Sequence, residues 1–233
     1  MWRIVLSLFL ITGFIRCEKT PTGKEIITQS IKAHGFSKPI DHLSYKKTTQ
    51  LFYPDGNLEK SIVQHHHISW KPFTYSIEQN IQKESKTTHF KNGKYFLTID
   101  GVEDDSQQGS DQAKEAIKTA YFVFWQPAKL ADPKAVVKYL GQRKIYDNKL
   151  VEAVAVDYPK SDSTDEWIFY FDPKTKFNLG YSVKHNDRWS LILNDAFHFD
   201  HSPILVKERR SFFIDSLNKT SSLRAAYTYT LDP

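Results

Sequence analysis

The apolar positions of this 233-residue chain repeat with two different periods. Over residues 22–35 (TGKEIITQSIKAHG) they fall three or four positions apart, which predicts a short amphipathic helix that Thr22 caps and Gly35 ends. The same spacing returns over residues 111–126, just before Pro127. The apolar positions there are Ala113, Ala116, Ile117, Ala120, Tyr121 and Phe124. We therefore expect two principal helices.

Most of the remaining chain alternates apolar and polar side chains, as β-strands do. Residues 43–53 and 58–70 flank a strong hairpin turn, and a two-residue turn at Asp55-Gly56 places Tyr53 opposite Leu58 and Tyr45 opposite His66. Residues 104–111 (DDSQQGSD) are predicted to form a polar loop. Further strands are predicted over 73–81, 87–99 (a hairpin), 135–140, 149–158, 165–172, 178–184, 189–199, 204–214 and 223–231.

These segments predict an α+β fold that is mostly antiparallel β. The roughly eleven strands are too closely spaced for parallel crossovers, so the sheet should be antiparallel. Residues 167–171 (WIFYF) and much of 189–199 are apolar on both faces, so both faces need cover. The simplest arrangement is a strongly curled sheet, a half-barrel. Its short N-terminal helix would accompany one central helix packed in the concave face.

The N-terminal residues read as an export signal. A short basic head is followed by twelve mostly apolar residues, 4–15 (IVLSLFLITGFI). That is too short for a membrane span, which needs roughly twenty residues, and is the right length for a signal peptide. We predict a signal peptide over residues 1–16, a tether over 17–22 and a single domain over 23–233.

Cys17, the only cysteine, directly follows the apolar run. A bacterial lipoprotein signal has this layout, and two acyl chains on the cysteine suffice for stable membrane attachment. Arg16 departs from that pattern, because the position usually holds a small residue. The alternative is an ordinary signal peptide or an uncleaved anchor with an incidental cysteine. In either case no internal disulfide can form, so the fold depends on its core.

Composition narrows the class further. Aromatic residues make up 14%, all apolar residues 40% and charged residues 25%, which is typical of a globular protein. The net charge is +5, and basic pairs such as Lys46-Lys47 and Arg209-Arg210 are scattered among acidic residues. Nucleic acid is therefore not an expected partner.

Few residues suggest catalysis or metal binding. On a strand His65 and His67 point to one face and His66 to the other, and no further ligands stand at metal spacing. We therefore expect exposed strand histidines and no metal. His198 and Asp200 share a strand face, but a polar strand end explains them as well. The sequence contains no recognised catalytic motif, so neither an enzymatic activity nor a cofactor is expected.

Aromatic residues offer the remaining candidate surface. The end of the central helix and two predicted strands carry large rings that would line one apolar cavity or fill a solid core, and the sequence leaves both possibilities open. The candidate cavity residues are Trp70, Tyr121, Phe122, Phe124, Trp125, Trp167 and Phe169.

Several stretches resemble a family of bacterial lipoproteins of unknown function. They are SIKAHGF (30–36), AYFVFWQPAKLADP (120–133), YLGQRKI (139–145), DEWIFYFDPKTKFNLGYSVKH (165–185) and RRSFFIDSLNKTSSLRAAY (209–227). The order of elements is also similar to the LolA/LolB-like lipoprotein-carrier superfold. That resemblance implies an antiparallel sheet curled around a helix, with an apolar cavity that holds acyl chains or another lipophilic ligand. It implies no catalytic residues.

Together these observations predict a non-enzymatic binding or carrier module in the cell envelope. Acylated Cys17 would anchor it to the outer membrane, and its partner would be a lipid or another lipophilic small molecule. One alternative is a scaffold lipoprotein with a solid core and an exposed apolar patch. A second is an envelope hydrolase using His198 and Asp200, which requires both side chains to converge in a cleft.

Overall fold

The computed structural model describes residues 20–36, 40–81, 83–158, 165–214 and 220–232. The predicted signal peptide and residues 17–19 of the predicted tether, including Cys17, lie outside these ranges. Within them, no helix has the length and apolar character needed to cross a membrane.

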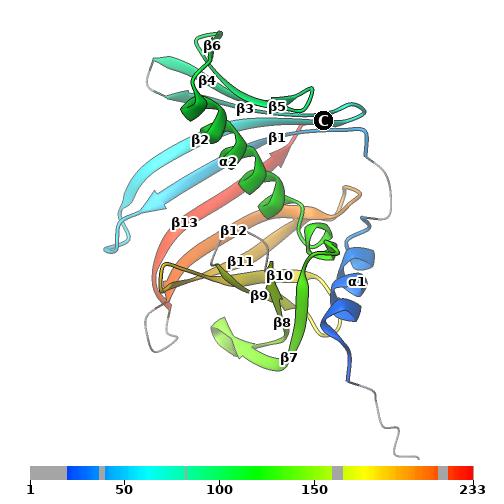
Figure 1. Cartoon of the computed structure of the whole chain (residues 1–233). Helices are drawn as coiled ribbons and strands as arrows, with labels where there is room; N and C mark the ends of the chain where they lie inside the picture. The colour runs from blue at the N-terminus through cyan, green and yellow to red at the C-terminus, as the bar shows by residue number, and fades with distance from the viewer. Residues whose placement is uncertain (1–19, 37–39, 82, 159–164, 215–219, 233) are drawn as a thin grey trace, which may run out of the picture.

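The described residues form one antiparallel sheet of thirteen strands in the order β6-β5-β4-β3-β2-β1-β13-β12-β11-β10-β9-β8-β7. The strands are β1 His42–Phe52, β2 Leu58–Trp70, β3 Phe73–Ile81, β4 Glu84–Lys91, β5 Lys94–Ile99, β6 Val102–Asp104, β7 Val136–Ile145, β8 Lys149–Asp157, β9 Glu166–Phe171, β10 Asn178–His185, β11 Arg188–His198, β12 Leu205–Ile214 and β13 Thr220–Leu231. The sheet thus consists of two meanders, β1–β6 and β7–β12, and β13 joins them by pairing with β1 and β12. Figure 1 shows the sheet strongly curled.

Two α-helices lie against this sheet (Figure 1). Helix α1, Gly23–Ala33, begins with a capping box in which Thr22 and Glu25 bond to each other's backbone N–H. Helix α2, Gln107–Phe124, crosses the concave face and packs on β3, β4 and β5. A short 3₁₀ turn, η1 (Ala128–Ala131), follows α2 and contacts α1. A second, η2 (Tyr146–Asn148), joins β7 to β8.

His34, which follows α1, ties this helix to the sheet. The backbone N–H of Asn178 donates to His34 Nε2 at 3.1 Å, so the proton is on Nδ1, which lies 2.8 Å from the Ile204 carbonyl. Burial lowers the pKa of His34 to about 4. The ring is therefore a neutral cross-link between α1, β10 and the segment before β12.

The curled antiparallel sheet confirms the predicted fold class, and three details need correction. The described chain has thirteen strands rather than roughly eleven, partly because β6 is too short to show a periodicity. Helix α2 begins inside the predicted polar loop, where the Ser106 side chain accepts from the N–H of Gly109 and caps it. Tyr45 lies opposite His66 as predicted, but an irregularity near Leu51 places Phe52, not Tyr53, opposite Leu58.

Apolar side chains cover both faces of the C-terminal meander, as predicted. On the inner face, Phe169 and Phe171 of β9 pack with Ile26 and Ile27 of α1. On the outer face, Tyr170 belongs to a separate cluster that also takes in side chains near the β7–β8 connection, such as Tyr146. This two-sided burial anchors the C-terminal half of the sheet.

Candidate ligand-binding pocket

A pocket of about 460 Å³ lies between α2 and the inner face of the sheet. This volume falls within the roughly 300–1,000 Å³ typical of small-molecule sites. The α2 side contributes Glu115, Ala116, Thr119, Ala120, Val123 and Phe124. The sheet contributes Tyr45, Lys47, Gln64, His66 and Ile77 from β1–β3, and Tyr181, Ile192, Arg209, Tyr227 and Tyr229 from β10–β13.

The residue pattern of α2 explains why space remains there. Ile117 and Phe124 are buried in the cluster that α2 forms with the N-terminal meander. The neighbouring helical face carries the smaller side chains of Ala116, Ala120 and Val123, which line the pocket. Small side chains on one face and large ones on the next keep the helix packed while leaving room over β12 and β13.

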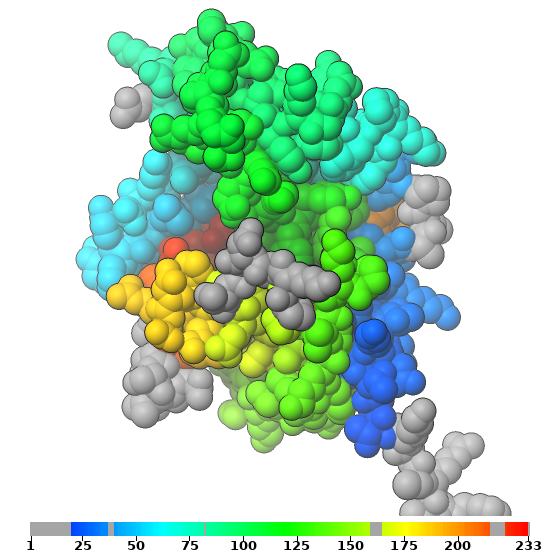
Figure 2. Space-filling view, in the orientation of Figure 1, coloured from blue at the N-terminus to red at the C-terminus, as the bar shows by residue number. Residues whose placement is uncertain are grey.

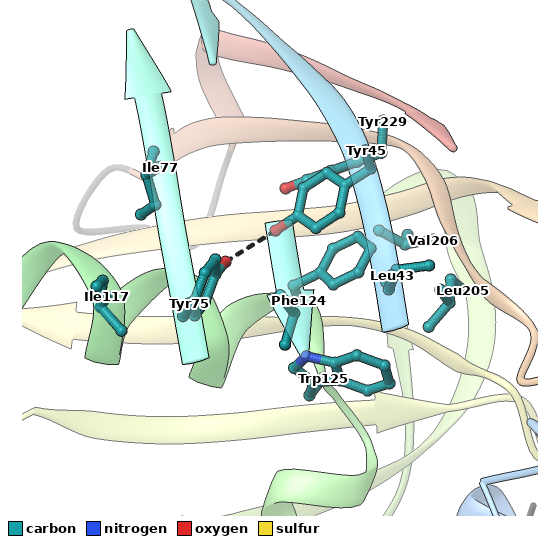
Figure 3. Close-up of a cluster of buried hydrophobic side chains, with 11 residues drawn as sticks. Leu43, Tyr45, Tyr75, Ile77, Ile117, Phe124, Trp125, Leu205, Val206 and Tyr229 are labelled. Carbon is teal, nitrogen blue, oxygen red and sulfur yellow. Dashed lines mark hydrogen bonds between the residues drawn. The ribbon is translucent and has the colours of Figure 1, made fainter. Parts of the chain in front are cut away.

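Aromatic rings form the wall beside α2 (Figure 3). Tyr45 stacks on Phe124 with ring centroids 4.1 Å apart, and the Tyr45 and Tyr75 hydroxyls lie 3.0 Å apart. The Tyr75 hydroxyl also lies 2.9 Å from Nδ1 of His66, whose ring stacks on Tyr45 at 4.5 Å. The wall is therefore a connected tyrosine–histidine network rather than a purely apolar surface.

His66 keeps one ring nitrogen without a partner in this network. The side chain is buried, which corrects the expectation that all three strand histidines are exposed, and no described residue hydrogen-bonds Nε2. Burial first, and then the positive charge of Lys47, lowers the pKa of His66 to about 3. A neutral histidine thus presents unused hydrogen-bonding capacity at the pocket in either tautomer.

Arg209 of β12 is a buried cation at the pocket. Its Nε donates to Asn194 Oδ1 at 2.8 Å, and its two terminal nitrogens lie 3.4 and 3.5 Å from the Val123 carbonyl. That carbonyl belongs to the last turn of α2, where the helix dipole favours positive charge. The guanidinium also lies 5.8 Å from the Tyr181 ring centroid and 5.9 Å from that of Tyr229.

Lys47 of β1 is the second cation of the pocket. It is half-buried, opposite Tyr229 in the strand pairing, and its Nζ lies 5.6 Å from the Tyr227 ring centroid. Burial, followed by the charge on Arg209, lowers the pKa of Lys47 to about 8. Among the described residues, no carboxylate forms an ion pair within 4 Å of Lys47 or Arg209.

Six of the seven aromatic residues singled out from the sequence lie outside the lining of this pocket, in two packed groups. Phe124 lines the pocket itself. Trp70, Tyr121 and Trp125 pack together at one side, with the Trp70 and Trp125 ring centroids 4.9 Å apart. Phe122, Trp167 and Phe169 form part of the cluster beneath α1, where Phe122 and Trp167 are 5.4 Å apart.

The other histidine candidates lie away from the pocket. His65 is exposed, and Nδ1 of His67 lies 2.9 Å from the Ser44 hydroxyl. Nε2 of His198 lies 2.8 Å from the Tyr229 carbonyl, whereas Asp200 is exposed in the turn after β11. The described part of the chain contains no group of three or more His, Cys, Asp or Glu side chains that could hold a metal ion.

Comparison with known proteins identifies the fold. No family model and no curated protein matches the chain. A LolA superfamily protein from Nitrosomonas europaea superposes with a TM-score of 0.56 at 9% identity, covering 90% of this chain and 92% of that one. A putative outer membrane lipoprotein-sorting protein domain from Vibrio parahaemolyticus gives 0.53 at 9% identity, covering 91% and 90%. The chain therefore has a LolA-like fold, as the sequence predicted.

Proposed function

We propose that this protein is a non-enzymatic envelope module that binds or carries a lipophilic ligand in the pocket beneath α2. The observation that carries the proposal is the pocket itself, lined by aromatic rings and small helix residues on the concave face of a LolA-like sheet. The description of the Vibrio neighbour as a lipoprotein-sorting domain supports the same assignment.

We further propose that the protein is exported and anchored to the outer membrane through acylated Cys17. The apolar run before Cys17 supports this assignment, because it has the length of a signal peptide. Mass spectrometry of the N-terminus in the membrane fraction tests the anchor against a Cys17→Ala variant. An acylated wild type and an unacylated variant are expected, whereas the same soluble, unacylated species from both would contradict the anchor.

The two alternative functions have less support. A pocket of about 460 Å³ is not expected of a scaffold with a solid core. Three of the large apolar residues with high exposure, Leu58, Val102 and Phe199, lie on β2, on β6 and in the turn after β11, which are not neighbours in the sheet. A hydrolase needs His198 and Asp200 in one cleft, but the His198 ring lies against a backbone carbonyl and Asp200 is exposed.

The test is lipid analysis of the purified full chain by native mass spectrometry, followed by binding of radiolabelled palmitate. Ala116→Phe fills the pocket from an exposed helix position, so the fold should tolerate it. Lys118→Phe adds the same ring to α2 outside the pocket and serves as the control. We expect Ala116→Phe to reduce binding at least tenfold and Lys118→Phe to leave it unchanged. A full chain that neither retains nor binds any lipophilic molecule would overturn the proposal.

A further inference from the structure

The polar side chains of the pocket cluster at one region of its wall. Strand β13 lies between the two cations. Its Tyr229 pairs with Lys47 of β1, and its Tyr227 pairs with Arg209 of β12. His66 lies on β2, opposite Tyr45 of β1. It is close enough to Lys47 for the charge of that lysine to lower the pKa of His66. Two cations, and a histidine whose Nε2 has no partner among the described residues, therefore line one pocket from β1, β2 and β12, with β13 between β1 and β12.

No carboxylate of the described residues pairs with Lys47 or Arg209. Arg209 contacts a backbone carbonyl, an amide oxygen and two aromatic rings, none of which carries a negative charge. Glu115 is the one carboxylate among the described lining residues. It is exposed on α2, and its Oε1 accepts a hydrogen bond from the Thr119 hydroxyl. A buried charge without a counter-charge is costly, and an anionic ligand would supply one.

The rest of the pocket is suited to a hydrocarbon chain. Phe124, Val123 and Ala120 on α2 face Ile192 and Tyr181 of the C-terminal meander across it. Its volume is at the small end of the range for ligand sites, which favours one alkyl chain over the two of a diacyl lipid. A polar cluster at one part of an apolar pocket matches a molecule with one charged end.

We infer that the pocket binds a single-chain anionic amphiphile, whose headgroup oxygens contact Lys47, Arg209 and His66. This inference rests on the proposed function and specifies its ligand class. A carboxylate and a phosphate share the required chemistry, because both are compact anions with several acceptor oxygens that suit an ammonium and a guanidinium.

Ligands that share one chain and differ in headgroup test the inference. Binding to the purified full chain is measured for radiolabelled palmitate, 1-palmitoyl lysophosphatidic acid and 1-monopalmitoylglycerol. We expect at least one of the two anions to bind about tenfold more tightly than the neutral glyceride, as loss of a charge-assisted contact implies. The comparison between the two anions distinguishes a carboxylate from a phosphate ligand.

Two residues of the same strand provide matched variants. Lys47→Gln should weaken binding of the preferred anion about tenfold and leave the glyceride unchanged. Lys46→Gln, on the outer face of β1, should change neither. Arg209→Lys keeps the charge but not the planar guanidinium, so it should fold and weaken anion binding less than Arg209→Gln does. Thermal unfolding checks that each variant is folded.

The outcomes separate the inference from the function it rests on. Equal affinity for the anions and the neutral glyceride would overturn the inference and leave lipophilic binding standing. An equal loss in Lys46→Gln and Lys47→Gln would also overturn it, because surface attraction rather than the pocket would explain the anion preference. Failure of all three ligands to bind would overturn the inference, and it would overturn the proposed function as well if native mass spectrometry finds no lipophilic molecule retained by the full chain.

Discussion

Basic residues that are adjacent in sequence have different partners and different exposure on the two faces of the central strands. On the outer face, Arg210 forms two hydrogen bonds of 2.7 and 2.8 Å with Asp195, and Lys46 is exposed to solvent. On the inner face, Arg209 and Lys47 are withdrawn from solvent without a carboxylate partner among the described residues. The protein or water thus balances the charges on the outer face, whereas no carboxylate of the described residues pairs with the two charges on the inner face.

The largest effect should come from the histidines of β2. Burial lowers the pKa of His66 to about 3, whereas an unfolded histidine titrates near 6.5, so the unfolded state binds more protons between these values. The free energy of unfolding is therefore unaffected by this group above pH 6.5. On acidification to pH 4, proton uptake by His66 in the unfolded state lowers the free energy of unfolding by about 3 kcal/mol.

Urea unfolding at pH 6.5 and pH 4 measures this loss. The His66→Phe variant should gain about 3 kcal/mol relative to wild type between the two pH values, because its ring cannot be protonated. His65→Gln, on the outer face of the same strand, should follow wild type. Parallel pH profiles for wild type and His66→Phe would show that His66 is not buried as described.

Arg209 and Arg210 provide the next comparison. Arg209→Ala removes the donor to Asn194 and to the Val123 carbonyl in a buried site, and should lower the free energy of unfolding by about 2–3 kcal/mol. Arg210→Ala breaks a partly exposed ion pair and should cost less than about 1 kcal/mol. Urea unfolding at neutral pH measures both costs. Similar costs would remove the distinction between the two faces.

A smaller effect should appear in ligand binding at alkaline pH. The pKa of Lys47 is about 8 in the free protein, and the titratable or charged groups lining the pocket with it are Tyr45, His66, Glu115, Tyr181, Arg209, Tyr227 and Tyr229. Raising the pH from 8 to 9.5 removes the proton from Lys47, so palmitate affinity should fall by up to about tenfold. Equilibrium binding should show this fall in wild type and a flat profile in Lys47→Gln. A flat wild-type profile would place the anion away from Lys47.

The smallest effect concerns stability without ligand. Lys47→Met keeps the alkyl stem and removes a desolvated charge that has no carboxylate partner among the described residues. We expect a gain of up to about 1 kcal/mol in the unfolding free energy of the ligand-free protein, together with weaker anion binding. Chemical denaturation compares the variant with Lys46→Met on the outer face. A clear loss of stability in Lys47→Met alone would mean that the ammonium has a structural role.

The fold was largely readable from the sequence because its signals are local. The turn at Asp55-Gly56, the alternation along β1 and β2 and the helical spacing before Pro127 each fix an element without long-range information. Helix α2 begins earlier than expected because the cap at Ser106 sits within a polar stretch that carries no apolar periodicity. Of the seven aromatic candidates, the structure buries Phe124, Trp125 and Phe169 and leaves the other four half-buried. Their sequence does not reveal which rings pack together and which line open space.

The polar part of the candidate site was missed for a related reason. Lys46-Lys47 and Arg209-Arg210 read as scattered surface charges, although alternation already placed Lys47 on the same strand face as Leu43 and Tyr45. A lysine at the period-two position of buried residues was the sequence feature that could have indicated this cation in the pocket. That Lys47 and Arg209 share one pocket depends on β13 inserting between β1 and β12, a pairing between the two ends of the domain that no local pattern encodes.

Photocrosslinking tests the central claim most directly. A palmitate analogue that carries a diazirine near its methyl end is bound to the full-length protein and irradiated. Peptide mass spectrometry then maps the crosslinked residues. The account predicts crosslinks on α2 near Val123 and on the inner faces of β10 and β11 near Tyr181 and Ile192, with loss of these crosslinks in Ala116→Phe. Crosslinks confined to the outer face of the sheet, or unchanged in Ala116→Phe, would contradict it.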